Sequence, residues 1–414
     1  MSYPPALVAR IETALSRVET KATAEQRVAV HAVLQRAHAQ AFGTRDRAAA
    51  EVESRIDQPE FAHVLSALRQ APAGESLAEF ELPGGTTADG MILGTGKYEA
   101  LDPGWLEAAA AWLEHLFDHA PWPEGAPEGV RIPDQATLAL LGDWGTGAFG
   151  DETAPALQIA QWLDGRKKGD PDRPDVLVHL GDVYYDGTCA REKAHLLHYW
   201  PTTYAQSFAL NSNHEMYAGA HGLFQEVLTG RGRFAAQGCH SQFVLKNAHW
   251  RVIGLDTAYF SDRWNGYMSG RLDPKRQVPW LRAQVERAKV RGQRLLLLSH
   301  HNGLDLAGAK VNALWHQVRD VVRHGDFHWY WGHIHAAAAY QPVGGVLARC
   351  NGHGGVPWGR ATDLADSPRA EWYESQEWQA PKVHNGFVTL SLDGAEITET
   401  FRDEQGRVRW TNQP

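Results

Sequence analysis

Apolar positions recur at helical spacing in the first part of the chain. The first such pattern comprises Leu7, Ile11, Leu15 and Val18. Thr23 and Gln26 then form a capping-box pattern in front of a second helical stretch. Asp102 and Pro103 mark the start of another helical stretch, because an acidic N-cap residue followed by proline is typical of the first turn of a helix. These patterns predict a helical N-terminal region over residues 1–117.

A different pattern begins at residue 136, where short apolar runs alternate with amphipathic helical stretches. The runs include "TLALL", "DVLVHL", "WRVIGLD" and "RLLLLS", which are typical of buried strands in βαβ units. The alternating stretch 386–411 favours antiparallel strands. Residues 118–135 hold four prolines and are the predicted linker. The sequence therefore predicts an α/β catalytic domain over residues 136–414.

Composition narrows the classes of protein and partner. The net charge of −9 argues against a nucleic-acid-binding protein with a basic face. The three cysteines, Cys189, Cys239 and Cys350, do not suit a disulfide framework, so reduced thiols are the simpler interpretation. The first residues lack a signal-peptide pattern, and no apolar run approaches the roughly 20 residues that span a bilayer. We expect a cytoplasmic protein that binds neither a membrane nor nucleic acid.

Five polar motifs each follow an apolar run, which is where an α/β fold places its chemistry. In chain order they supply Asp143 in "LLGD", Asp182 in "HLGD", Asn213 and His214 in "NHE", His300 and His301 in "LSHH", and His333 and His335 in "GHIH". Taken singly, each motif has an ordinary interpretation as a turn or a helix cap. Carboxylates and imidazoles gathered on loops from several strands also suit a pair of metal ions. Five such motifs in this order rarely arise by chance.

The order of these motifs resembles the calcineurin-like metallophosphoesterase superfamily over roughly residues 135–400. The resemblance implies an α/β four-layer sandwich of two mixed β-sheets flanked by helices, here with an N-terminal helical extension. It also implies a dinuclear metal centre at one edge of the sandwich. The helical extension has no counterpart that the resemblance identifies.

The resemblance assigns a role to each matching residue. It makes Asp182 the ligand that bridges the two metals. The other expected metal ligands are Asn213, His300 and His333 for the second ion, and Asp143 and His335 for the first. His214 would be the catalytic, substrate-facing histidine. The choice of His300 over His301 stays open, because the family's histidine usually stands two residues before a proline and Asn302 occupies that position here.

One departure in the first motif points to a further ligand. Most members carry a histidine two residues after the first aspartate, where this chain has Gly145. Purple acid phosphatases share that departure and instead supply a tyrosine three residues after the bridging aspartate, which is the position of Tyr185. A hard, anionic phenolate favours Fe(III), so we expect Fe(III) plus a divalent ion, either Fe, Zn or Mn. Alternatively Tyr185 is an ordinary core aromatic, a role that Tyr184 fits better.

The resemblance implies a hydrolase of phosphate esters, either phosphomonoesters or small phosphodiesters such as nucleotides. A metal-bridging hydroxide would attack phosphorus in line, and His214 would assist the phosphoryl oxygens or the leaving oxygen. Candidate substrate-binding residues are His214, His301, His221 and His353, although His353 is equally well a turn residue. The alternatives are a nuclease of the same fold, which the acidic charge disfavours, and a non-catalytic binding or scaffolding protein. A homo-oligomer formed through the N-terminal helices is a further expectation.

Overall fold

The computed structural model describes residues 5–42, 104–148, 154–204, 206–323, 325–356, 362–379 and 382–414. Two larger sheets lie at its centre, and both mix parallel with antiparallel strands. The six-stranded sheet has the order β16 (Val408–Asn412), β15 (Glu396–Asp403), β14 (Gly386–Asp393), β2 (Gln135–Leu141), β3 (Val176–His179) and β4 (Ser207–Ala209). Its strands β2, β3 and β4 run parallel, and β14 pairs antiparallel with β2.

The eight-stranded sheet contains most of the remaining strands. Its order is β1 (Gly129–Arg131), β5 (Phe243–Lys246), β6 (Trp250–Leu255), β7 (Arg294–Ser299), β8 (Phe327–Trp331), β10 (Val346–Asn351), β9 (Ala337–Tyr340) and β11 (Ala370–Tyr373). Strands β6, β7, β8 and β10 run parallel. A separate antiparallel pair consists of β12 (Glu377–Gln379) and β13 (Lys382–Val383).

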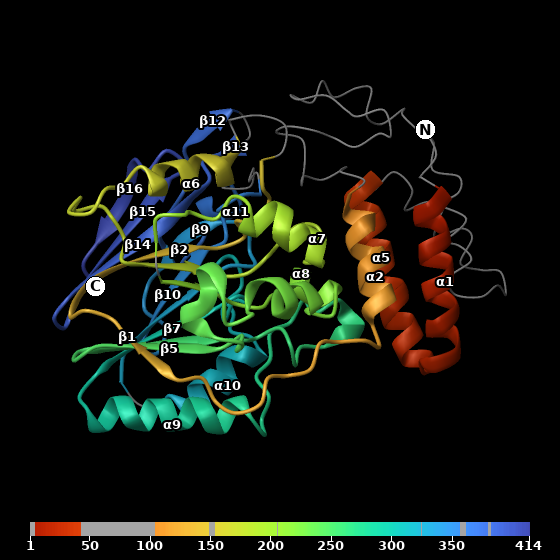
Figure 1. Cartoon of the computed structure of the whole chain (residues 1–414), viewed down its shortest axis with the longest axis horizontal. Helices are drawn as coiled ribbons and strands as arrows, with labels where there is room; N and C mark the ends of the chain where they lie inside the picture. Colours follow the sequence, from red (N-terminus) through yellow and green to blue (C-terminus); the bar gives the residue numbers. More distant parts are fainter. Residues whose placement is uncertain are drawn as a thin grey trace.

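Apolar side chains fill the space between the two sheets and cover their outer faces. The inner core includes Leu138, Leu140, Val176, Val178 and Phe208 from one sheet and Val252, Leu296, Leu298 and Tyr330 from the other. Helices α9 (Gln277–Val290) and α10 (Ala313–Val321) cover the outer face of the eight-stranded sheet, and α6 (Pro155–Asp164) covers that of the six-stranded sheet. Figure 1 shows α6 and α9 on opposite sides of the sheets. The predicted four-layer sandwich of two mixed sheets is therefore confirmed.

A buried ion pair joins the two sheets. Arg349 of β10 donates to both carboxylate oxygens of Glu399 of β15 over 2.6–3.0 Å, and both side chains are fully buried. Tyr330 and Asn412 donate to the same carboxylate, and the remaining Arg349 nitrogen donates to backbone carbonyls. Because every polar atom of the pair has a partner, the charges are tolerated inside the core.

Short helices connect the strands. They are α7 (Cys189–Arg191), η3 (Glu192–Leu197), α8 (Asn213–Tyr217), η4 (Leu223–Val227), η5 (Gly232–Gln237), η6 (Arg263–Asn265) and α11 (Thr362–Ala365). None of the helices in the described part of the chain is both long and apolar enough to cross a membrane.

The N-terminal helices form a layer against one side of the sandwich (Figure 1). This helical layer comprises α1 (Pro5–Lys21), α2 (Ala24–Phe42) and α5 (Trp105–His115). The capping box at α2 is confirmed, because Gln26 N–H donates to the Thr23 hydroxyl over 3.2 Å and Thr23 N–H donates to the Gln26 side chain over 2.8 Å. Residues 43–103, which also belong to the predicted helical region, lie outside the described residues.

The helical layer shares a core with the sandwich. The cluster joins Ile11, Leu15, Val30, Leu106 and Trp112 of the layer to Met216, Ala258 and Tyr267 of the sandwich. Within the predicted linker, Ala120 N–H donates to Gly219 over 2.8 Å and β1 pairs with β5. The structure therefore places a strand inside the stretch 118–135, and the division of the chain into domains stays a prediction.

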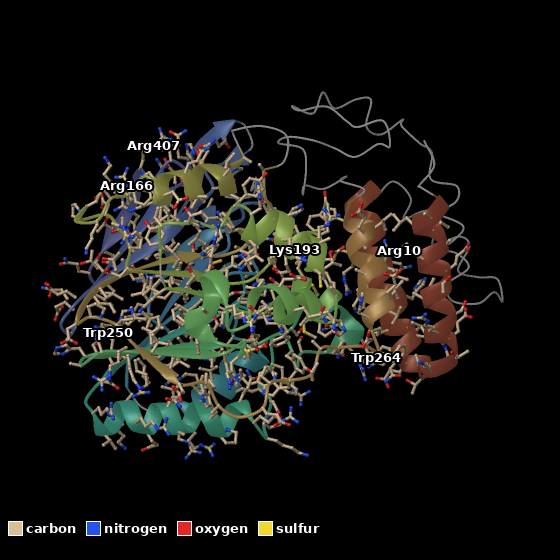
Figure 2. All side chains as sticks on the ribbon, in the orientation of Figure 1. Arg10, Arg166, Lys193, Trp250, Trp264 and Arg407 are labelled. Atoms are coloured by element: carbon tan, nitrogen blue, oxygen red, sulfur yellow. The ribbon has the colours of Figure 1, made fainter. Side chains whose placement is uncertain are left out.

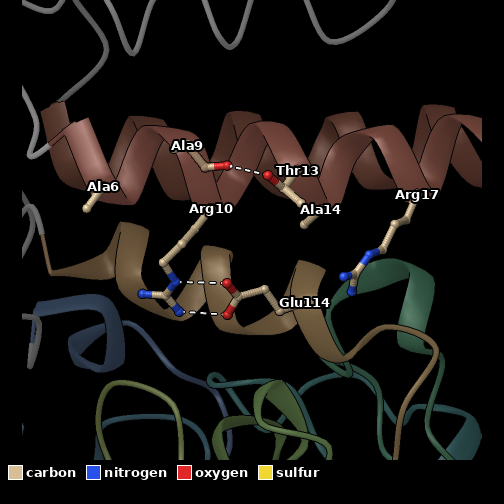
Figure 3. Close-up of a pocket in the computed structure, with 7 residues that line it drawn as sticks. All are labelled: Ala6, Ala9, Arg10, Thr13, Ala14, Arg17 and Glu114. Carbon is tan, nitrogen blue, oxygen red and sulfur yellow. Dashed lines mark hydrogen bonds and ion pairs between the residues drawn. The ribbon is translucent and has the colours of Figure 1, made fainter.

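A pocket lies between α1 and α5 of the helical layer (Figure 3). Its lining residues are Ala6, Ala9, Arg10, Thr13, Ala14, Arg17 and Glu114. Arg10 donates two hydrogen bonds, of 2.8 and 2.7 Å, to the Glu114 carboxylate across it. The small side chains of α1 open this pocket, while the ion pair holds the two helices together.

Candidate metal centre

The five motifs meet where the carboxyl ends of strands from both sheets lie close together. Asp143 follows β2, Asp182 follows β3, and Asn213 opens α8 after β4. From the eight-stranded sheet, His300 follows β7, while His333 and His335 follow β8. Because parallel strands end at the same edge of a sheet, residues that are up to 192 positions apart become neighbours. The structure thus brings all these predicted metal ligands except Tyr185 into one site.

Three of the site residues have an unusual backbone. Asp143, Asp182 and His333 have positive φ angles of 55°, 77° and 66°. A non-glycine residue in this region costs about 1–3 kcal/mol and persists where surrounding contacts hold it in place. One such contact is direct, since His333 N–H donates to Asp143 Oδ2 over 2.8 Å. The backbone is therefore held in a form that turns these side chains toward one another.

The first group of ligand atoms surrounds the Tyr184 hydroxyl. This hydroxyl donates to Asp182 Oδ2 over 2.9 Å and lies 3.3 Å from Asp143 Oδ1. The Nε2 atom of His335 is 2.8 Å from the same hydroxyl and 3.5 Å from Asp143 Oδ1. Burial, followed by the charge of Asp182, raises the pKa of Asp143 well above its usual range. Two buried carboxylates this close together suit a cation between them.

Tyr185, the predicted phenolic ligand, lies outside the two groups of ligand atoms in this structure. Its ring packs against Trp105 with centroids 5.5 Å apart, and the Arg191 guanidinium lies 5.3 Å above it. A side chain on Gly104 would collide with the ring, so Tyr185 fills a tight space beneath α5. The loop after β3 instead turns the preceding residue, Tyr184, toward the aspartates. Motif spacing alone does not reveal which of two adjacent tyrosines faces the site.

The second group of ligand atoms consists of Asn213, His300 and His333. The Nε2 atom of His300 lies 2.8 Å from Asn213 Oδ1 and 3.2 Å from His333 Nδ1. The Nδ1 atom of His300 lies 3.0 Å from the Leu180 carbonyl and so carries the proton of the neutral ring. Burial lowers the pKa of His300 to about 3 and also lowers that of His333, so both imidazoles are neutral.

The donor chemistry of this second group fits a metal ion. With its proton on Nδ1, His300 presents a lone pair on Nε2 to Asn213 Oδ1, which is also an acceptor. The Nδ2 group of Asn213 donates to the Tyr217 hydroxyl over 3.1 Å, and this fixes which amide atom faces the site. Two electron-pair donors 2.8 Å apart with no hydrogen between them repel each other, and a bound cation removes that repulsion.

Of the adjacent histidines, His300 suits the ligand role better than His301. His301 is close to His300 and His333, and the three could together hold an ion. However, its Nδ1 atom lies 2.9 Å from the Thr257 hydroxyl and its Nε2 atom 2.7 Å from the Tyr267 carbonyl. Both nitrogens of His301 therefore have partners and its side chain is buried, and a role for it in substrate binding stays a prediction.

The other substrate-binding candidates lie in different surroundings. His353 is 2% exposed and packs beside Phe401, with ring centroids 6.4 Å apart, so it does not line an open site. His221 faces Asp118 at 3.5 Å and the His115 ring at 5.8 Å. His221 is placed against the helical layer rather than among the metal-site residues, and substrate-binding roles for both histidines stay predictions.

His214 is held in one orientation at the centre of the site. Its Nδ1 atom lies 2.6 Å from the Tyr185 carbonyl, while Nε2 lies 3.7 Å from Asp182 Oδ2. The rings of Tyr184 and Tyr217 flank it at centroid distances of 4.4 and 4.9 Å. With Nδ1 donating to the carbonyl, Nε2 is the atom directed toward the centre.

Two residues behind Asp182 belong to the site, although the sequence gives them no ligand role. The Ser212 hydroxyl caps α8 by accepting from His214 N–H over 3.0 Å and is in hydrogen-bond contact with the carboxyl groups of both Asp182 and Glu215. Glu215 accepts from Asp182 N–H over 3.3 Å. Burial, followed by the charge of Asp182, raises the pKa of Glu215 to about 8. Glu215 is the last residue of the "NHE" motif and Ser212 precedes that motif directly, and these positions were the signal for their supporting role.

Comparisons with known proteins give distant likenesses. No family model matches the chain, and no curated protein matches it in sequence. Similar solved structures include a dimetal phosphatase from Danio rerio, with 14% identity and a TM-score of 0.44 over 67% of this chain and 98% of that one. A predicted phosphoesterase from Streptococcus pneumoniae has 10% identity and a TM-score of 0.29 over 68% of this chain and 99% of that one. A single mutant of Vps29 from Entamoeba histolytica has 13% identity and a TM-score of 0.27 over 67% of this chain and 99% of that one.

Proposed function

We propose that this chain is a dinuclear-metal-dependent hydrolase of small phosphate esters. The observation that carries the proposal is the position of Asp182 between the two groups of ligand atoms. Its Oδ1 lies 3.2 Å from His300 Nε2 in the second group, and its Oδ2 accepts from Tyr184 in the first. A carboxylate with one oxygen toward each group is placed to bridge two ions.

Each group can hold one ion with ligands of different character. The first would use Asp143, Tyr184 and His335 together with the shared Asp182. Its carboxylates are hard, anionic ligands, and its phenol would become one on losing its proton to solvent when the ion binds, which supports Fe(III) there. The second would use Asn213, His300, His333 and the shared Asp182, which suits a divalent ion such as Fe, Zn or Mn. When bound, such a pair polarises the phosphoryl oxygens and lowers the pKa of a water for in-line attack.

The residues of the chain itself would position the substrate and move a proton. His214 directs Nε2 toward the centre while its other nitrogen is held by the Tyr185 carbonyl. When it carries a proton on each nitrogen, it can donate the Nε2 proton to the oxygen of the departing alcohol and is left as the neutral ring with Nδ1–H. His300 and His333 remain neutral because of burial, which keeps them available as ligands rather than as acids.

Reconstitution with metals tests the proposal. The purified chain would be loaded with iron, zinc or manganese and assayed with p-nitrophenyl phosphate and bis(p-nitrophenyl) phosphate. We expect about two metal equivalents per chain and hydrolysis of at least one ester. Asp182→Asn should lose both metal and activity, whereas Asp393→Asn, on the exposed end of β14, should retain both. Absence of bound metal after reconstitution, or metal without hydrolysis of any ester, would favour a binding protein instead.

A further inference from the structure

Trp105, the first residue of α5, reaches from the helical layer to the metal centre. Its ring meets those of Tyr184 and His214 edge-on, each at a centroid distance of 6.1 Å. It also contacts Tyr185 at 5.5 Å, and it is half-buried. Thus a residue from outside the five motifs touches both the phenol of the first ligand group and the histidine proposed to donate the proton.

Two more side chains extend this set of contacts: Tyr217 lies beside His214, and Met268 lies beside Tyr217. The Tyr217 ring is 4.9 Å from the His214 ring, and its hydroxyl lies 3.7 Å from the sulfur of Met268. Met268 is 46% exposed, which is unusual for a large apolar side chain. We call Trp105, Tyr217 and Met268 the aromatic rim. Because the rings of Trp105 and Tyr217 contact His214, the rim lies where the organic part of a substrate would meet the protein.

The helical layer holds Trp105 in place. Glu107, two residues along α5, forms an ion pair with Arg191 of α7. Further along the helix, the Trp112 indole donates to the Arg263 carbonyl over 2.9 Å, and Arg263 donates to Leu116 over 3.2 Å. A side chain fixed on a packed helix presents its ring in a defined position, which a binding site requires.

The chemistry of the rim bears on the substrate. Trp105 and Tyr217 are aromatic, and Met268 carries an apolar thioether. Such side chains favour a flat, uncharged group, on which the rings can stack.

We propose that the aromatic rim binds the leaving group and selects phosphate monoesters whose alcohol carries a flat, apolar ring. The inference rests on the proposed phosphate-ester hydrolysis and assigns the helical layer a part in substrate choice. Trp105 acts as a specificity residue, since it contacts the leaving group and not the phosphorus.

A pair of substrates that differ only in the ring provides the test. The metal-loaded protein would be assayed with 2-phenylethyl phosphate and with ethyl phosphate, whose leaving alkoxides are chemically alike. The variants are Trp105→Ala, Trp105→Phe and the control Trp264→Ala. Trp264 packs on Phe117 at 5.8 Å at the edge of the helical layer (Figure 2) and is the matched tryptophan outside the rim. Binding of 2-phenylethylphosphonate and ethylphosphonate, which cannot be hydrolysed, would be measured by calorimetry.

The wild type should prefer the phenylethyl ester by about tenfold or more in kcat/KM, with a similar preference in phosphonate affinity. Trp105→Ala should remove most of that preference, while Trp105→Phe and Trp264→Ala should keep it. Equal kcat/KM for both esters in the wild type, or an unchanged ratio in Trp105→Ala, would overturn the inference and leave the hydrolase proposal standing. Ring-selective phosphonate binding without hydrolysis of either ester would overturn the hydrolase proposal and keep the rim as a binding site.

Discussion

Replacing Glu399 with glutamine would break the ion pair that joins the two sheets. Arg349 would then be buried opposite a neutral amide, although it makes three hydrogen bonds to the carboxylate in the wild type. Removing one member of a fully buried, hydrogen-bonded pair typically costs about 3–5 kcal/mol. For a chain of 414 residues the entropy of unfolding at the midpoint is about 0.9 kcal/mol/K, so Tm should fall by about 3–6 °C.

The chain offers a matched control in the Arg10–Glu114 pair of the helical layer. That pair is also bidentate, but its side chains are 46% and 29% exposed. An exposed pair contributes about 0–1 kcal/mol, so Glu114→Gln should lower Tm by about 1 °C or less. Scanning calorimetry of both variants measures the difference. If Glu399→Gln and Glu114→Gln lowered Tm by the same amount, the larger stabilisation assigned to the buried Arg349–Glu399 pair would be refuted.

The buried Arg349–Glu399 pair also predicts how the Tm difference between the wild type and Glu399→Gln depends on pH. Burial alone would raise the pKa of Glu399, but the hydrogen bonds and charge of Arg349 outweigh it and lower the pKa below its usual value of 4.5. A lowered carboxyl pKa stabilises the fold above the unfolded value, and that contribution is lost as pH falls through the folded value. The Tm gap between wild type and Glu399→Gln should therefore be full at pH 7 and shrink below pH 4.5.

Three shorter predictions concern the metal centre. Tyr217→Phe removes the hydroxyl that accepts from the Asn213 amide and fixes its orientation. The affinity for metal should therefore fall about 10–100-fold, as measured by titration against a competing chelator. Unchanged affinity would contradict this prediction. His214→Gln should lower kcat about 10²–10⁴-fold with the metal content unchanged, and loss of metal would instead make His214 a ligand. Removing the metal with a chelator should lower the free energy of unfolding by about 2.7 kcal/mol, compared with protein in a free metal concentration of about 100 times the Kd. An identical Tm with and without metal would argue against a bound ion.

Local and periodic features of the chain were predictable from sequence. The Thr23–Gln26 capping box depends on residues three positions apart, and the structure contains it. The strand-end position of Asp143, Asp182 and His300 follows from buried apolar runs, because the carboxyl ends of parallel strands gather at one edge. Residue spacing along the chain is sufficient to predict both the capping box and these strand-end positions.

Features that depend on distant contacts or on loop geometry were not predictable. The direction of the loop after β3 decides between Tyr184 and Tyr185, and residue spacing does not encode it. The partners that occupy both nitrogens of His301 come from segments more than 30 positions away. Strand β1 lies in a proline-rich stretch and forms because β5, far along the chain, supplies its pairing edge. Trp105 likewise becomes part of the site only through packing of the helical layer.

The measurement that tests the central claim most directly is metal content together with the visible spectrum after reconstitution with Fe(III) and zinc. It would be made on the wild type, Tyr184→Phe and Tyr185→Phe. A phenolate bound to Fe(III) gives a charge-transfer band, and Tyr184 is the phenol that faces both aspartates. The account predicts about two metal equivalents per chain, with a band that persists in Tyr185→Phe and disappears in Tyr184→Phe. A chain that holds no metal, or a band lost only in Tyr185→Phe, would contradict it.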